Sequence, residues 1–185
     1  MKKTKAFQFF NENYSVKEYS DMYKKLRLDI RYPANVKREQ IFVKLLKKHK
    51  PKKIIDAGCG AAMPLINIKK LGFNIIGYDK AKNMLLEAKE NLVQNRLSPD
   101  LVFYDDFECP KKIKDNSVDC IIGMGAFYYA KNVNKTLNNQ KKKLKKNGRI
   151  IFSLRNRLFD ITTLNNYTRK FLDEIYEIKR LKKDW

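Results

Sequence analysis

Two aspartates, Asp56 and Asp79, each stand at the end of a short apolar run, 23 residues apart in the chain. Asp56 is followed by the loop GCGAA at 58–62, whose small residues let a backbone come very close to a ligand. A glycine turn between a strand and a helix is typical of a nucleotide site, and a carboxylate such as Asp79 can accept hydrogen bonds from two ribose hydroxyls. The pattern therefore predicts a nucleotide-like ligand.

The spacing of the loop favours one ligand class over another. A dinucleotide site normally reads G-x-G-x-x-G and rests a pyrophosphate on the helix N-terminus, whereas this loop reads G-x-G-x-A, one residue tighter. The charge of Asp56 beside the loop disfavours a pyrophosphate and suits a ligand that carries an ammonium group and no phosphate. S-adenosylmethionine is such a ligand.

The elements that must position these residues alternate along the chain. Apolar runs at 54–55, 75–77, 101–104, 120–122 and 150–154 predict strands, and the stretches 64–71, 81–95 and 131–146 between them predict helices. Continuous apolar runs indicate strands buried on both faces, and their alternation with helices indicates a parallel sheet. We therefore expect an α/β fold, a Rossmann-like three-layer sandwich with a mostly parallel sheet.

The chain divides into three expected regions. Residues 1–50 form an N-terminal helical segment, 51–156 form the ligand-binding core, and 157–185 form a C-terminal helical segment. An amphipathic helix is expected over 164–181, as a substrate cap or as the remainder of a truncated fold.

The strong basic charge is expected to lie away from the ligand. The chain has 41 Lys and Arg against 20 Asp and Glu, a formal net charge of +21. The main lysine runs, at 44–53, 69–70, 111–114 and 141–146, each precede a predicted strand, whereas ligands bind where strands end. We interpret these lysines as structural and solvating, so nucleic acid is not the favoured partner.

The three cysteines show no metal-ligand spacing, and no metal site is expected. Their odd number and the lack of a signal peptide favour a reducing, cytoplasmic setting. No apolar run approaches the ~20 residues needed to span a bilayer.

Several segments resemble one known family. IIDAGCGAA (54–62) resembles the first motif of class I S-adenosylmethionine-dependent methyltransferases, (I/L)(I/L)DxGCGxG. The resemblance runs from about 40 to 156, through IIGYDKAKNMLLEAKENL, FYDDFE, DNSVDCIIGMGAFYYA and LKKNGRIIFSLRN, in order and at the expected distances. It implies S-adenosylmethionine as the cofactor and methyl transfer to an O, N or C acceptor as the activity.

The resemblance also implies roles for single residues. Asp79 would bind the ribose, Met84 would pack near the adenine, and either Asp105 or Asp106 would accept the adenine amino group. The residues expected at the cofactor are Asp56, Gly58, Cys59, Gly60, Asp79, Lys80, Met84, Asp105, Asp106, Phe107, Gly123 and Met124.

The acceptor is expected beside the ends of the fourth and fifth strands. Tyr128, Tyr129, Arg155 and Asn156 are the expected substrate residues. The two tyrosines replace a histidine pair of the family, so no catalytic base is carried over. The N/D-P-P-Y motif of amide and adenine-amino methyltransferases is absent, and a small-molecule acceptor is favoured.

Two other functions stay open at this point. One is an NAD-dependent oxidoreductase, and the other is a catalytically degenerate methyltransferase fold that binds nucleic acid. The family sheet usually has seven strands, whereas five are predicted here, so the last hairpin is expected to be missing and 149–154 to form a sheet edge. A longer parent protein, the helix near 164–181 or a second copy in a homodimer would then cover that edge.

Overall fold

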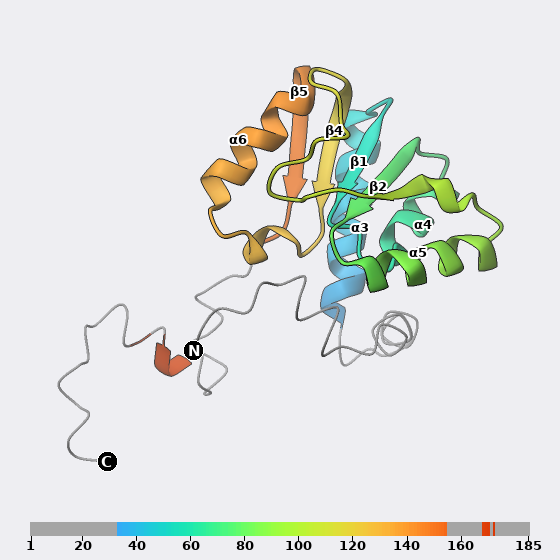
Figure 1. Ribbon diagram of the computed structural model, residues 1–185, viewed down its shortest axis with the longest axis horizontal. Coiled ribbons are helices and arrows are strands. Elements are labelled where there is room, and N and C mark those ends of the chain that lie inside the picture. Colours follow the sequence, from blue (N-terminus) through green and yellow to red (C-terminus); the bar gives the residue numbers. More distant parts are fainter. Residues whose placement is uncertain (1–32, 155–167, 171, 173–185) are drawn as a thin grey trace. The chain divides into compact units, whose positions relative to one another are not determined.

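The computed structural model describes residues 33–154, 168–170 and 172, without the side chains of Pro33, Ala34 and Tyr128. By its contacts the chain divides after Ser153, and the sheet and its helices belong to the first unit (Figure 1). In the second unit, residues 168–170 and 172 are helical. The expectations for residues 1–32, for Arg155 and Asn156, and for most of the helix at 164–181 lie outside the described residues.

The described core is built on one parallel sheet. Its strands are β1 (Ile54–Ala57), β2 (Ile75–Asp79), β3 (Val102–Tyr104), β4 (Val118–Gly123) and β5 (Leu144–Phe152), in the spatial order β3-β2-β1-β4-β5. The chain leaves β1 towards β2 and β3, then returns to the other side of β1 with β4. Ligands bind at such a reversal, outside the carboxyl ends of the strands. The predicted Rossmann-like fold class is confirmed.

Helices cover both faces of the sheet. They are α3 (Pro33–His49), α4 (Met63–Lys70), α5 (Lys82–Gln94) and α6 (Val133–Lys143), with short 3-10 turns η1 (Pro99–Leu101) and η2 (Phe127–Tyr129). Apolar side chains of α3, α4 and α5 pack with Ile54, Ile75 and Ile122 on one face. On the other face Ile55, Tyr78 and Ile121 lie with Ile113 and Leu144. The two buried clusters explain the continuous apolar runs of the strands.

The boundary between α6 and β5 differs from the expectation. A helix over 131–146 was predicted, but α6 ends at Lys143 and β5 begins at Leu144. Leu144 pairs with Val118 and Arg149 pairs with Cys120, so the register shifts across an irregular stretch of β5 that contains Asn147, whose φ is 68°. Leu144 is buried with Val118 and pairs with it, so its apolar side chain joins the core, and the helical prediction for 144–146 is wrong.

β5 lies at an edge of the described sheet, as expected for 149–154. It pairs with β4 only, through Gly123 and Phe152 at its end. Pairing of this edge in a homodimer stays a prediction.

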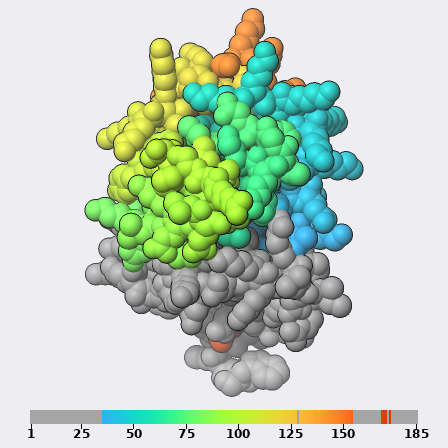
Figure 2. Space-filling model, turned by 90° about the vertical axis from the view of Figure 1, so that its right-hand side faces the viewer, coloured from blue at the N-terminus to red at the C-terminus, as the bar shows by residue number. Residues whose placement is uncertain are grey.

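The lysine runs lie where the strands begin. Lys52 and Lys53 precede β1, and Lys141 and Lys142 are exposed at the end of α6. Lys143 pairs with Asp115, with 2.6 Å between Nζ and Oδ1. In Figure 2, segments coloured cyan, yellow and orange, from the starts of β1, β4 and β5, project from the top of the described core.

We expect replacement of Lys141, Lys142 and Lys143 together by glutamine to leave cofactor binding and turnover nearly unchanged. These side chains lie at the edge of the sheet opposite the strand ends, and the single ion pair that is lost is worth about 0–1 kcal/mol. Binding calorimetry and initial rates check this. A large loss of turnover, reproduced in the parent protein by added salt, would instead indicate a polyanionic substrate.

Candidate cofactor site

Asp56 is the buried carboxylate at the centre of the candidate site. It is the third residue of β1, between Gly77 of β2 and Ile122 of β4, and only 2% of it is exposed. Burial, together with the charge of Asp79, raises the pKa of Asp56 to about 7. A nearby cation would favour the ionised form, so this position suits an ammonium group.

The loop after β1 is a tight turn tied to β2. The φ angles of Gly58 and Gly60 are 77° and 53°, in the left-handed region that glycine adopts without strain. The backbone N–H groups of Gly58 and Cys59 donate to the carbonyl of Tyr78 at 2.9 and 3.0 Å. The turn leads into α4, which has Pro64 near its start. This fixes the N-terminus of α4 beside Asp56.

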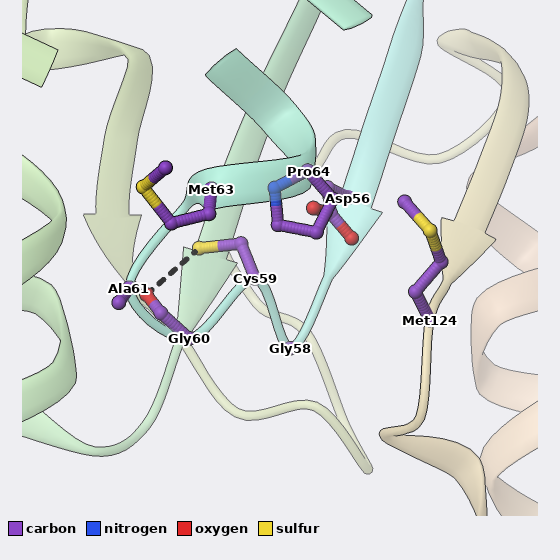
Figure 3. A pocket seen from close by; sticks show the side chains of 8 residues that line it. All are labelled: Asp56, Gly58, Cys59, Gly60, Ala61, Met63, Pro64 and Met124. Carbon is purple, nitrogen blue, oxygen red and sulfur yellow. Dashed lines mark hydrogen bonds between the residues drawn. The ribbon is translucent and has the colours of Figure 1, made fainter. Parts of the chain in front are cut away.

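A pocket lies beside this turn (Figure 3). Its lining residues are Asp56, Gly58, Cys59, Gly60, Ala61, Met63, Pro64 and Met124. Five of them were expected from the sequence, and Ala61, Met63 and Pro64 were missed. The signal that could have found these three is their place in the glycine loop and the first turn of the helix that follows it.

Gly58 is needed because another loop lies directly against it. A Cβ atom on Gly58 would stand 2.6 Å from Cβ of Ala126 and 3.8 Å from the ring of Phe107. Gly123 is similarly constrained, since a Cβ there would stand 2.5 Å from the ring of Phe127. The close approach predicted at Gly58 is therefore made here by the loop that follows β4, which also brings Met124 to the pocket.

Asp79 connects the glycine loop to the start of α5. Its Oδ2 accepts a hydrogen bond from the backbone N–H of Gly60, and its Oδ1 accepts one from the N–H of Ala81, both at 2.8 Å. Burial raises the pKa of Asp79 despite these hydrogen bonds. Because a carboxylate has about four acceptor positions, the backbone donors of Gly60, Lys80 and Ala81 still leave capacity for a ribose hydroxyl.

The structure gives Asp105 and Asp106 different surroundings. Asp105 is 5% exposed, and its carboxylate accepts from the backbone N–H groups of Asp106 (2.8 Å), Lys111 (3.0 Å) and Lys112 (2.8 Å). It thereby organises the loop after β3. The side chain of Asp106 is 35% exposed and forms an ion pair with Lys80.

The surroundings of Asp106 favour its ionised form. Partial burial raises the pKa of Asp106, but the hydrogen bonds from Lys80 and from the backbone N–H of Glu108 outweigh burial, and the net pKa is lowered. Asp106 is therefore a charged acceptor beside Lys80, whereas the acceptor positions of Asp105 are taken by its own loop.

The other expected residues lie around these groups. Met84 is 3% exposed and packs against Ala61 and Ala81, as a buried support for the glycine loop. The ring of Phe107 stands edge-on to that of Phe127, with 4.8 Å between centroids. Tyr129, on η2, is 45% exposed.

Replacement of Asp56 by asparagine should flatten the pH dependence of stability. The ordinary pKa of this carboxyl is 3.8 and the folded value is about 7, so the folded protein holds the extra proton between these pH values. The contribution of Asp56 to stability is therefore lost as pH rises from about 4 to about 7. Melting temperatures at pH 5 and pH 8 should differ less in the Asp56→Asn variant. An unchanged difference would contradict the burial of this charge.

One family model matches most of the chain. The methyltransferase domain family matches residues 48–182. A ubiquinone biosynthesis O-methyltransferase of Pelagibacter ubique is 27% identical over 130 residues, which cover 70% of this chain and 50% of that protein.

Solved structures show the same fold. A SAM-dependent methyltransferase of Thermotoga maritima has a TM-score of 0.62 at 19% identity, covering 82% of this chain and 62% of that one. A methyltransferase of Geobacter sulfurreducens in complex with S-adenosyl-L-homocysteine has a TM-score of 0.50 at 18% identity, covering 63% and 47% of the two chains.

The fold and the family match together define a Rossmann-like methyltransferase domain. The chain belongs to the methyltransferase domain family, and with the family comes S-adenosylmethionine as the cofactor. The resemblance predicted from the sequence is confirmed. The chain spans about half the length of the curated relatives it matches.

Two findings concern other kinds of site, within the residues that the structure describes. No helix there is long and apolar enough to cross a bilayer. No group of three or more histidine, cysteine or acidic side chains gathers there in a way that could hold a metal ion.

Proposed function

We propose that this domain transfers a methyl group from S-adenosylmethionine to an O, N or C atom of a small-molecule acceptor. The observation that carries the proposal is Asp56, a buried carboxylate at the end of β1 that faces a pocket walled by the glycine turn. A pyrophosphate would meet an unfavourable charge there, whereas the aminocarboxypropyl group of this cofactor brings an ammonium. The residues present therefore fit the cofactor.

The residues of the chain bind and orient the reactants. Asp56 would pair with the ammonium group, and Asp79, held by Gly60 and Ala81, would accept the ribose hydroxyls. Cys59, Met63 and Met124 give the pocket an apolar wall. When bound, the cofactor supplies a methyl group already activated by its positive sulfur. The protein then mainly holds the two reactants close together and excludes water.

We assign the hydrogen bond with the adenine amino group to Asp106 rather than to Asp105. Asp106 is half-buried and charged, and Lys80 lies beside it from the end of β2. Asp105 has its carboxylate engaged by three backbone N–H groups. The unequal exposure of the two side chains supports this choice, which the sequence left open.

We place the methyl acceptor beside the loop that follows β4. Met124 lines the pocket and Tyr129, five residues on, is exposed, so this loop can reach both the cofactor and an acceptor. The O-methyltransferase among the relatives makes hydroxyl compounds the first acceptors to test. A small acceptor and a cytoplasmic location are proposals, the latter resting on the three free cysteines.

The proposal is tested by titration followed by turnover. Isothermal calorimetry with S-adenosylmethionine, S-adenosylhomocysteine and NAD should show binding of the first two only. A radiolabelled methyl donor with panels of hydroxyl, amine and carbon acceptors should then identify the acceptor class. Binding of NAD alone, or salt-sensitive binding of nucleic acid without cofactor binding, would overturn the proposal.

A further inference from the structure

Gln140 joins α6 to both a strand and a loop. It is 1% exposed, and its Nε2 donates to the hydroxyl of Tyr78 on β2 and to the backbone carbonyl of Phe107, each at 2.7 Å. Its Oε1 is buried and has no hydrogen-bond partner in the described part of the chain. If the amide were turned over, Oε1 would face the Phe107 carbonyl, and two acceptors would meet. The Phe107 carbonyl therefore fixes the orientation of the Gln140 amide.

The neighbouring residue of α6 holds the next peptide of the same loop. Nδ2 of Asn139 donates to the backbone carbonyl of Glu108 at 2.9 Å. Two successive carbonyls, those of Phe107 and Glu108, are thus bound by two successive side chains of one helix. A backbone held at consecutive peptides cannot rotate freely, so α6 sets the conformation of this part of the loop.

This part of the loop carries Asp106. The backbone N–H of Glu108 donates to Oδ1 of Asp106 at 2.9 Å, so the held peptide orients the carboxylate. The buried carboxylate of Asp105 accepts hydrogen bonds from other backbone N–H groups of the same loop. The backbone N–H of Asp105 itself donates to the carbonyl of Asp79 at 3.2 Å. Neither Gln140 nor Asn139 lines the cofactor pocket.

We propose that Gln140 and Asn139 are positioning residues for recognition of the cofactor's base, acting through the Phe107–Glu108 backbone on Asp106. The inference rests on the proposed function, in which Asp106 accepts a hydrogen bond from the adenine amino group. It predicts that their loss changes selectivity among bases more than it changes binding of the rest of the cofactor, which Asp56 and Asp79 hold.

The experiment compares two ligands that differ at the base. S-adenosylhomocysteine has the amino group, and S-inosylhomocysteine has an oxo group in its place and would face the Asp106 carboxylate unfavourably. Calorimetry with the parent protein should show a preference for the adenine ligand of about tenfold or more. In Gln140→Leu the preference should fall about fivefold, because the carboxylate is no longer held in place.

The chain offers a matched control on the same helix. Thr136 lies one turn earlier, is equally buried at 1% exposed, and donates through its hydroxyl to the carbonyl of Asn132 at 2.9 Å. Thr136→Val therefore removes a buried polar group from α6 without touching the loop, and the base preference should stay at the parent value. Asn139→Ala, at a half-buried position, serves as a second variant should Gln140→Leu fail to fold.

The outcomes separate this inference from the proposed function. A lower base preference in Gln140→Leu or Asn139→Ala, with Thr136→Val unchanged, supports the positioning role. An unchanged preference in Asn139→Ala and in folded Gln140→Leu overturns it, as does an equal fall in Thr136→Val. If the parent protein binds neither ligand, the proposed function fails and this inference fails with it.

Discussion

Replacement of Asp79 by alanine should weaken binding of S-adenosylhomocysteine by about 1.5–3 kcal/mol, roughly a tenfold to 150-fold rise in the dissociation constant. Two contributions are lost together. The ribose loses a charged acceptor, and the backbone N–H groups of Gly60 and Ala81, each 2.8 Å from the carboxylate, lose the group that holds them. Calorimetry measures the change directly.

One variant separates these two contributions, and a second variant serves as a control. Asp79→Asn keeps one side-chain oxygen and should retain part of the loop structure, so its affinity should lie between those of Asp79→Ala and the parent. Asp115→Ala removes an exposed carboxylate that pairs with Lys143 and should leave the affinity unchanged. If Asp79→Ala bound S-adenosylhomocysteine as tightly as the parent protein does, the assignment of Asp79 to the cofactor would be wrong.

Replacement of Gly58 by alanine should lower both the free energy of unfolding and cofactor affinity. At a φ of 77° an alanine is strained by about 1–2 kcal/mol, and its Cβ would stand 2.6 Å from that of Ala126. Overpacking of this kind adds about 1–3 kcal/mol. Relief of the clash must move the loop after β4, which carries Met124 into the pocket, so the affinity should fall by at least about tenfold.

Gly72 provides the matched control for backbone strain. Its φ is 90°, but a Cβ there would meet nothing within 4 Å. Urea unfolding of Gly72→Ala should therefore show only the strain of about 1–2 kcal/mol, with unchanged cofactor affinity. Equal effects of Gly58→Ala and Gly72→Ala on unfolding and on binding would contradict the close contact between the two loops.

The main part of the fold could be predicted because it depends on local patterns. The apolar runs that precede Asp56 and Asp79 place both residues at strand ends, and the sheet confirms the strand positions. The end of α6 was misplaced because its lysines suit a helix and only pairing of Leu144 with Val118 makes the segment a strand. Local preference is overruled there by a distant partner.

The contacts that distinguish the site residues could not be predicted. The sequence DDFE does not say which aspartate turns inwards, because that depends on N–H groups as far away as Lys112. Two other contacts also join residues that are distant in sequence. Gly58 meets Ala126, and Gln140 meets Phe107, and each contact involves a loop of irregular conformation. Turn and strand signals carry no information about such pairs.

The sulfur atoms of the pocket bear on its resistance to oxidants. Cys59 is buried, and burial raises the pKa of its thiol well above the usual range, so little of the reactive thiolate forms. Met63 and Met124 have no such protection, because a thioether reacts without losing a proton. Conversion of either one to its sulfoxide would place a polar group in the apolar wall of the pocket. Within the cofactor pocket, oxidation should therefore reach Met63 and Met124 before Cys59.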